Sequence, residues 1–331
     1  MRTELDIDPY ANDPGHWGAS LLTLAELILP CLDAAGARSV VEVGAYAGDL
    51  TRVLVAWAAR SGARVWAIDP APRRPLVELE AQRPELELVR ATGLDALRGI
   101  PLPDAAIVDG DHNYYTVGEE LRLIAERAGD GDRDLPLLIF HDVGWPHARR
   151  DDYYDPALVP PEHRQPIEEG TGVFPGVVGV RPGGLPYRYP ARREGGPRNG
   201  VLSAVEDFVA QREDLRLAVV PAFFGLGVVW RVSAPWADRV AGLLEHWDRN
   251  PLLERLEANR VLHLASSHFQ MAAAARERER ADRQEAVLRR LLDSSAFGVA
   301  ERLSRLRRRA GIATGASIVS KAEIRRALGE P

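Results

Sequence analysis

The stretch Ser39-Val-Val-Glu-Val-Gly-Ala-Tyr-Ala-Gly48 decides the fold of this chain. Its first half is apolar apart from Glu42, and its second half is a loop of small residues that begins at Gly44. Apolar residues at helical spacing follow from Leu50 onward. A short buried strand, a glycine loop and a helix in this order open a doubly wound domain. We therefore predict an α/β fold with a mostly parallel sheet.

The glycine loop departs from the dinucleotide fingerprint Gly-x-Gly-x-x-Gly. Tyr46 stands where the fingerprint has its second glycine, and the next helix opens with Asp49, a poor neighbour for a phosphate. The strand acid Glu42 favours a cationic ligand instead. The pattern resembles the first motif of class I S-adenosylmethionine (SAM) methyltransferases, especially the metal-dependent O-methyltransferases. The resemblance implies that SAM is bound by Glu42, Gly44, Ala45, Tyr46 and Gly48. A generic strand–helix turn with a chance acid is the alternative.

Composition narrows the function classes. The chain has 331 residues, 46% hydrophobic and 27% charged, which is ordinary for a globular protein. Its net charge of −6 provides no basic field to recruit nucleic acid. The single cysteine, Cys31, rules out an intrachain disulfide framework and is expected to be buried. No signal-peptide core or membrane-spanning run is visible, so we expect a cytoplasmic protein.

The second and third predicted strands also end in residues that suit a nucleoside. Asp69 follows the strand that starts at Arg64, about 20 residues after the glycine loop, where an acid meets ribose hydroxyls in nucleotide-binding folds. An ordinary strand-end acid is the alternative. The third strand, expected over 86–90, is followed by Thr92 and Gly93. The resemblance places these two residues near the adenine.

Two further strands run directly into polar residues. The strand from Ala105 continues into Asp109-Gly-Asp-His112, and the strand from Leu137 continues into His141-Asp142. Ligands bind beyond the carboxyl ends of parallel strands, and so many polar groups are costly to bury without partners. We therefore expect Asp109 and Asp142 to face one crevice. Two carboxylates with nearby histidines suit a divalent cation of the Mg²⁺ type.

These two motifs sharpen the resemblance. Asp-Gly-Asp-His and His-Asp are similar to the Asp-Gly-Ser-His and Glu-Asp of macrolide-sugar O-methyltransferases, and less so to the caffeoyl-CoA type. The resemblance implies His112 as general base, with Asp109 beside it, and Asp109 and Asp111 next to the cofactor. It implies a metal held by Asp109, His141 and Asp142. His141 replaces a glutamate, which leaves open a softer metal or none, and a purely structural role is the alternative for His112.

Residues 144–200 form a long insert, dense in Pro, Gly, Arg and Tyr, without periodicity. Such a stretch in a compact domain is usually functional, often a lid. Aromatic rings can stack on sugar or aryl faces, and arginines can hold carboxylates or phosphates. The candidate substrate residues are Tyr114, Arg149, Arg150, Tyr153 and Tyr154. A disordered surface loop is the alternative.

The rest of the chain sets the domain organisation. Strands over 215–220 and 227–232 predict a terminal antiparallel hairpin, and helical patterns follow from Pro235. We expect an N-terminal helical cap (1–38), whose His16 and Trp17 line the site or cap the surface. A methyltransferase domain (39–234) with the insert (144–200) and a helical extension (235–331) follow. The extension is expected to form a homodimer.

The sequence thus predicts a SAM-dependent O-methyltransferase that acts on a hydroxyl of a small molecule. A glycosylated or aromatic natural product or a saccharide suits the insert best. SAM is the expected cofactor, and a Mg²⁺-type cation is left open. One alternative is a nicotinamide-dependent or nucleotide-sugar-modifying Rossmann enzyme, although the missing middle glycine argues against it. The other is a non-enzymatic SAM-fold scaffold that acts through its helical extension.

Overall fold

The computed structural model describes residues 21–130, 135–170, 172–312 and 319–329. The turn-rich start of the chain, with the predicted site residues His16 and Trp17, lies outside the described residues. The chain divides into two compact units, Met1–Ser267 and His268–Pro331. The domain boundaries expected from the sequence stay a prediction.

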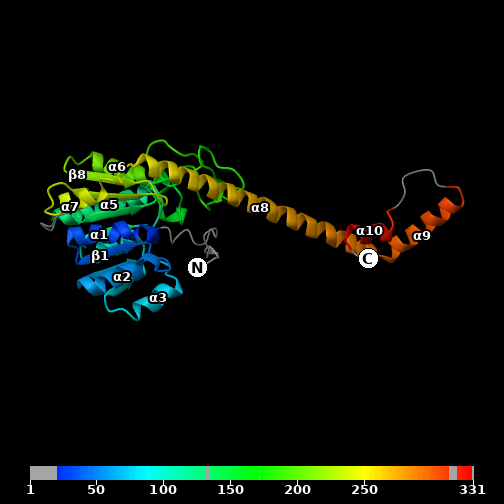
Figure 1. Cartoon of the computed structure of the whole chain (residues 1–331), viewed down its shortest axis with the longest axis horizontal. Helices are drawn as coiled ribbons and strands as arrows, with labels where there is room; N and C mark the ends of the chain where they lie inside the picture. Colours follow the sequence, from blue (N-terminus) through cyan, green and yellow to red (C-terminus); the bar gives the residue numbers. More distant parts are fainter. Residues whose placement is uncertain (1–20, 131–134, 171, 313–318, 330–331) are drawn as a thin grey trace, which may run out of the picture. The chain divides into compact units, whose positions relative to one another are not determined.

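A seven-stranded sheet forms the centre of the first unit (Figure 1). Its strands are β1 (Ser39–Val43), β2 (Arg64–Ile68), β3 (Leu86–Val89), β4 (Ala105–Val108), β5 (Leu137–His141), β8 (Leu215–Val220) and β9 (Leu226–Arg231). The order across the sheet is β3-β2-β1-β4-β5-β9-β8. Strand β9 pairs antiparallel with both of its neighbours, and the other pairs are parallel. The predicted α/β fold with a terminal hairpin is confirmed.

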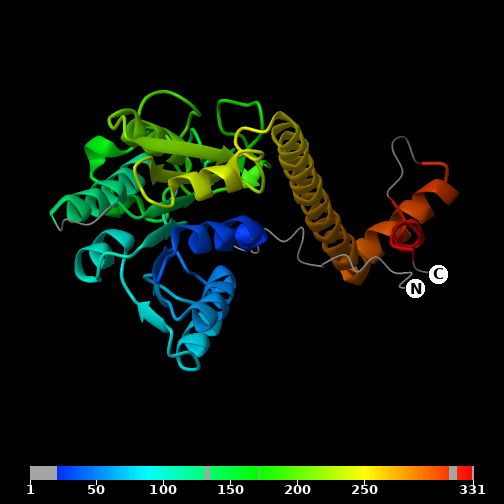
Figure 2. The same cartoon turned by 60° about the vertical axis from the view of Figure 1, so that its left-hand side comes forward.

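Helices cover both faces of this sheet (Figure 1; Figure 2). One face carries η2 (Leu21–Leu24), α1 (Ala25–Ala35), α2 (Asp49–Ser61), α3 (Arg74–Glu80) and α7 (Ala237–Leu244). The other carries α4 (Gly93–Gly99), α5 (Tyr114–Asp130) and α6 (Val201–Ala210). Ile28, Cys31 and Leu54 lie in the first core, and Leu121 and Val205 lie in the second. Because both faces are covered, β4 and the first four residues of β5, in the middle of the sheet, are apolar throughout.

The chain switches sides of the sheet between β1 and β4. Strands β2 and β3 lie on one side of β1, and β4 and β5 lie on the other, so the carboxyl ends of β1 and β4 frame a crevice. Val43 is in register with Val108, which brings the loop at Gly44 beside Asp109. Val108 is in turn in register with Phe140, just before the end of β5. The polar ends of β4 and β5 are therefore neighbours, as predicted.

The insert between β5 and α6 has little regular structure. It contains η3 (Pro156–Leu158), η4 (Pro161–His163) and a two-stranded ribbon of β6 (Gly172–Val173) and β7 (Leu185–Pro186). Asp151 holds its ends together, because one carboxylate oxygen accepts from the Gly200 N–H (2.6 Å) and from the Tyr114 N–H (2.8 Å). The Asp151 N–H also donates to the Asn199 side-chain oxygen (2.7 Å). The insert is therefore anchored at the start of both α5 and α6.

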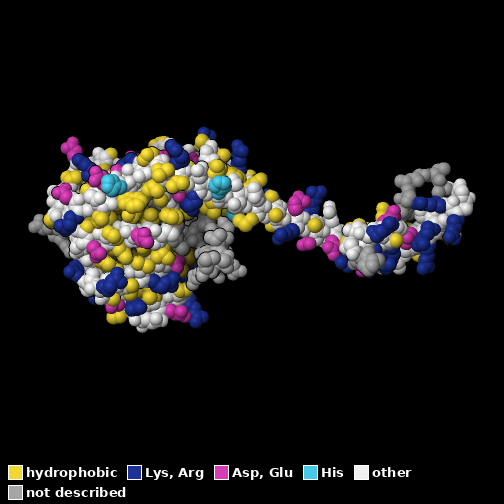
Figure 3. All heavy atoms as spheres, in the orientation of Figure 1, with side chains coloured by type: hydrophobic (Ala, Val, Ile, Leu, Met, Phe, Trp, Pro, Cys, Tyr) yellow, Lys and Arg dark blue, Asp and Glu magenta, His cyan; other side chains and the backbone are white. Residues whose placement is uncertain are grey.

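The second unit is helical. Helix α8 (Pro251–Asp293) begins in the first unit and continues into the second, which also contains α9 (Ser295–Arg309) and α10 (Lys321–Ala327). Arg307, Arg308 and Arg309 end α9, and Figure 3 shows the basic side chains gathered there. Dimerisation through these helices stays a prediction. Within the described ranges, no helix is both long and apolar enough to cross a bilayer.

Candidate active site

The glycine loop after β1 lies directly against the loop after β4. Gly44 has a φ of +88°, and a Cβ built on it would lie 2.0 Å from the carbonyl oxygen of Asp109. No side chain fits there, because so short a contact requires the backbone to move. The Gly44 N–H donates to the Ile68 carbonyl (2.9 Å), and the Asp109 N–H donates to the Val43 carbonyl (2.9 Å). The ends of β1, β2 and β4 are thus held as one unit.

Glu42 and Asp69 are the two acids beside this loop. Glu42 is buried and accepts a hydrogen bond from the Thr51 hydroxyl (2.6 Å). Burial raises the Glu42 pKa to about 8, although the Thr51 hydroxyl opposes that rise. The Asp69 carboxylate accepts from the Tyr46 N–H (2.8 Å) and the Ala71 N–H (2.7 Å). Asp69 therefore shapes the glycine loop and keeps further lone pairs for a ligand hydroxyl.

A third buried acid, Glu120, was not predicted as a site residue. It comes from α5, and its Oε1 lies 2.0 Å from where a Cβ on Gly93 would be. Its Oε2 is buried and has no hydrogen-bond partner among the described residues. Thr92 caps α4 at the same point, where its hydroxyl accepts from the Asp95 N–H (3.3 Å). Gly93, predicted near the cofactor together with Thr92, thus adjoins a carboxyl group whose Oε2 has no partner within the part of the chain that the structure describes.

This acid gives a testable pH dependence of stability. Burial raises the Glu120 pKa from its ordinary 4.5 to about 8. The folded protein then keeps a proton that the unfolded chain releases, so stability falls as pH rises from about 4.5 to about 8. Glu120→Gln should remove this loss of stability. Between pH 5 and pH 8, the free energy of unfolding of the variant should therefore rise relative to that of the wild type by on the order of a few kcal/mol. Urea unfolding at the two pH values measures it. Parallel profiles would contradict it, and Glu126→Gln, at an exposed position of α5, is the control.

Two carboxylates and two histidines meet where β4 and β5 end. His112 Nε2 lies 2.9 Å from Asp142 Oδ2 and 3.8 Å from Asp109 Oδ1. His141 Nδ1 lies 3.0 Å from Asp109 Oδ1 and 3.6 Å from Asp142 Oδ2. Asp142 adopts a φ of +58°, a strained conformation that is concentrated at functional sites. The structure brings these four predicted residues together, and we call them the acid–base cluster.

The charges in the acid–base cluster stabilise one another. Burial by itself lowers the pKa of both histidines, but the carboxylates of Asp142 and Asp109 raise the pKa of His112 and of His141 well above the ordinary value. Burial raises the Asp142 pKa, yet His141 and His112 hold it well below its ordinary value. The cluster therefore favours charged groups in a buried setting.

The donor set of the acid–base cluster fits a divalent cation. Ligand atoms of Asp109, His141 and Asp142 lie within 4.8 Å of one another. His141 Nε2 lies 2.9 Å from the Phe223 carbonyl oxygen, which can only accept, so this nitrogen carries the proton. The lone pair of a neutral His141 then lies on Nδ1, which faces the carboxylates. A metal-bound histidine typically has such a second partner.

Asp111, predicted beside the cofactor, organises its own loop. One carboxylate oxygen accepts from the His112 N–H and the Tyr154 N–H (both 3.1 Å). The other accepts from the Asn113 side-chain amide (2.6 Å) and the Thr116 hydroxyl (3.1 Å). Asp111 therefore fixes the backbone of His112 and connects it to the insert.

The structure places the predicted substrate residues in different settings. Arg150 is buried and donates to the carbonyls of Ala191 (2.6 Å) and Val178 (2.8 Å). Tyr153 is buried too, with its hydroxyl on Asp151 (2.8 Å). Tyr154 is 72% exposed. The remaining two lie at the surface near α6, where Arg149 pairs with Glu206 (2.7 Å) and the Tyr114 hydroxyl donates to Asp207 (2.9 Å).

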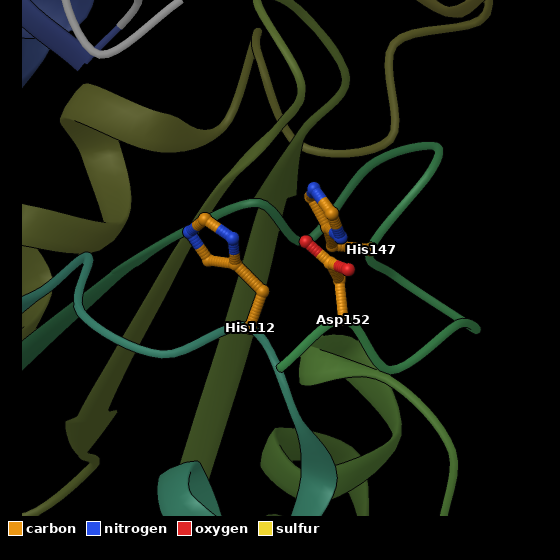
Figure 4. Close-up of side chains that lie close together, drawn as sticks. All are labelled: His112, His147 and Asp152. Atoms are coloured by element: carbon orange, nitrogen blue, oxygen red, sulfur yellow. The ribbon is translucent and has the colours of Figure 1, made fainter. Parts of the chain in front are cut away.

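The insert brings two residues to His112 that the sequence did not single out, His147 and Asp152 (Figure 4). The His147 ring stacks on the His112 ring, with centroids 4.5 Å apart, and meets the edge of Tyr187 at 4.9 Å. Burial lowers the His147 pKa to about 3, with the charge of His112 adding to the effect. Burial raises the Asp152 pKa to about 7. No periodicity in the insert could have indicated this placement.

No protein-family model matches the chain, and no curated protein matches it. Solved structures that resemble it include a methyltransferase of Podospora anserina (PaMTH1) with SAH bound, at 12% identity, 62% of this chain, 77% of that chain and a TM-score of 0.39. DesVI of Streptomyces venezuelae is 14% identical, and the match covers 65% of this chain and 92% of DesVI with a TM-score of 0.37. The 1,6-didemethyltoxoflavin-N1-methyltransferase of Burkholderia thailandensis is 15% identical, and the match covers 67% of this chain and 79% of that chain with a TM-score of 0.34. Because these identities and TM-scores are low, the fold is assigned from the strand order of this chain and not from the similarity.

Proposed function

We propose that this protein is a SAM-dependent methyltransferase that methylates a hydroxyl oxygen of a small molecule. The observation that carries the proposal is the double role of Asp109. Its main-chain carbonyl closes against Gly44 of the glycine loop, and its carboxylate belongs to the acid–base cluster. A ligand on the glycine loop and a base in the cluster therefore face the same crevice, as substrate and catalyst must.

In this proposal, the ends of β1, β2 and β3 hold the cofactor. Glu42 and the loop from Gly44 to Gly48 take its methionine end, Asp69 takes the ribose hydroxyls, and Thr92 and Gly93 adjoin the adenine. SAM supplies an electrophilic methyl group on a sulfonium. What these residues contribute is alignment, because holding the reactants in an attack geometry is worth on the order of 7–11 kcal/mol.

Asp69→Asn is expected to weaken SAM binding by about 10- to 100-fold, because a hydrogen bond to a charged group is worth about 1.5–3 kcal/mol. Calorimetric titration of the wild type and the variant measures this. Turnover at saturating SAM should change far less than affinity. Equal affinities would remove Asp69 from the cofactor site, and Asp238→Asn, at an exposed position of α7, is the control.

His112 is the proposed base. Its Nε2 lies 2.9 Å from the Asp142 carboxylate, so in the neutral tautomer Nε2–H donates to Asp142 and Nδ1 carries the lone pair. Nδ1 then takes the hydroxyl proton as the acceptor oxygen attacks the methyl carbon. Asp142 stabilises the imidazolium that results. Such a positioned base typically contributes about 10²–10⁴-fold.

Asp109, His141 and Asp142 would hold a divalent cation. A bound cation would offset the carboxylate charge that otherwise keeps His112 protonated, so that Nδ1 on the other side of the ring can act as the base. The mixed oxygen and nitrogen donor set also suits cations softer than Mg²⁺. The cation is therefore proposed as an activator whose identity must be measured.

The insert is the proposed acceptor site. Tyr154 is the best-placed contact, because it is exposed while its backbone is tied to Asp111 beside His112. Arg149 and Tyr114 offer polar groups at the surface near α6. Arg150 and Tyr153 support the insert from inside. Aromatic and arginine side chains suit a glycosylated or aromatic natural product or a saccharide.

Titration of the purified protein with SAM by calorimetry tests the proposal, with Mg²⁺ present and again after chelation. Micromolar binding is expected in both conditions. Screening of hydroxylated acceptors with labelled SAM then tests transfer, which chelation should reduce. Absence of SAM binding in both conditions would overturn the proposal, and nicotinamide cofactors and nucleotide sugars would be titrated next.

A further inference from the structure

A second cluster of ligating side chains lies beside the acid–base cluster and shares only His112 with it. It consists of His112, His147 and Asp152, whose ligand atoms lie within 4.8 Å of one another. Figure 4 shows the ring nitrogen of His112 nearest its Cβ, Nδ1, turned toward Asp152 and His147. The other nitrogen, Nε2, is the one that meets Asp142. The two clusters thus use opposite sides of one imidazole ring.

Two atoms in this second cluster are buried without partners. His147 is only 3% exposed, and its Nδ1 has no hydrogen-bond partner among the described residues. Asp152 Oδ1 is buried and lacks a partner there as well. A buried polar group without a hydrogen-bond partner lowers stability, so two of them in one cluster are unfavourable. A cation between them would satisfy both.

The scaffold holds these side chains in place. The Asp152 N–H donates to the His112 carbonyl (2.9 Å), which ties the two backbones together. The His147 carbonyl accepts from the Val201 N–H (2.8 Å) at the start of α6, and its ring is packed between His112 and Tyr187. The cluster is therefore built from anchored residues, which lowers the cost of organising a ligand set.

The ligand atoms of this second cluster indicate which kind of metal ion it would bind. Two imidazoles and one carboxylate suit Zn²⁺ and similar transition metals, whereas Mg²⁺ prefers an all-oxygen shell. We propose that His112, His147 and Asp152 form a binding site for a Zn²⁺-type ion, and that its occupation inhibits the enzyme. The inhibitory part rests on the proposed function, in which Nδ1 of His112 must accept the substrate proton. An ion on that nitrogen takes the same lone pair, so metal binding and base catalysis exclude each other.

The binding part is tested without any substrate. Zn²⁺ is titrated into chelator-treated protein by calorimetry with Mg²⁺ in excess, and Co²⁺ is used as a spectroscopic probe of nitrogen ligation. The wild type is compared with His147→Gln and Asp152→Asn. Each variant should weaken Zn²⁺ binding at least about 10-fold and diminish the visible Co²⁺ spectrum, because metal sites lose that much even when supporting residues are changed. His163→Gln, an exposed histidine of the insert, is the control.

The inhibition part compares each protein with its own zinc-free rate. Zn²⁺ should inhibit the wild type, and the inhibitory concentration should rise at least about 10-fold in both variants. Unchanged Zn²⁺ affinity in both folded variants, judged by circular dichroism and thermal melting, would overturn the site. Weaker Zn²⁺ binding in the variants, with an unchanged inhibitory Zn²⁺ concentration, would support the binding site and overturn its inhibitory role. Because the binding titration needs neither SAM nor an acceptor, failure of the proposed methyltransferase activity would not be mistaken for failure of the site.

Discussion

Replacing His112 with alanine is expected to lower methyl-transfer turnover by about 10²–10⁴-fold while the affinity for SAM stays nearly unchanged. His112 lies 2.9 Å from Asp142, on the side of the crevice formed by β4 and β5. The proposed cofactor residues lie at the ends of β1, β2 and β3. The substitution therefore removes the proton acceptor and leaves the glycine loop untouched. Single-turnover rates at saturating SAM, with calorimetric SAM affinities, measure the two effects separately.

His163→Ala is the control, because His163 is an exposed histidine of the insert that stacks on Tyr115 and belongs to neither cluster. It should retain turnover. A large loss of SAM affinity in His112→Ala would refute its assignment as base and make it a cofactor residue. A pH–rate profile adds a check, since the ionisation of the base should disappear from it in His112→Ala.

Asp142→Asn is expected to lower turnover by at least about 10²-fold and to weaken divalent-cation binding by at least about 10-fold. Asp142 orients His112 and faces His141, so its charge serves the base and the proposed cation together. Asparagine tolerates the positive φ of this position better than alanine, which limits the backbone penalty. Cation titration by calorimetry and turnover across a range of cation concentrations measure the two losses.

The outcomes of this substitution separate the two roles. Cation affinity equal to wild type with reduced turnover would assign Asp142 to the base alone and remove it from the metal site. Reduced affinity with turnover restored by high cation concentration would assign it to the cation alone. The exposed Asp238 of α7, replaced by asparagine, controls for the loss of one negative charge.

Much of the fold follows from local patterns. The runs that end at Val43 and Val108 are predictable as strands because they are apolar apart from Glu42, as strands covered on both faces of a sheet require. The meeting of Asp109 and Asp142 was predictable too, since parallel neighbouring strands bring their carboxyl ends to one edge. His141 joins them because it is the last residue of β5.

The rest depends on contacts that no local pattern encodes. Glu120 is on a helix whose polar residues mostly face solvent, and its burial follows from the close approach of Gly93. His147 and Asp152 reach His112 through an insert with little regular structure, so neither strand nor helix periodicity indicates their positions. Arg150 looks like a ligand-binding residue in the sequence, yet main-chain carbonyls of the insert accept its hydrogen bonds.

The hydrogen bonds of Asp151 have a consequence for how the sequence of the insert can change in evolution. Because one carboxylate joins the beginning of the insert to its end at Gly200, the chain between them leaves and re-enters the scaffold at nearly one point. The length and sequence of that segment can therefore change without altering the spacing of the elements it connects. Evolution, or an engineer, could exchange residues 154–197, which include the exposed Tyr154, to change the proposed acceptor site while the sheet and the acid–base cluster are inherited intact.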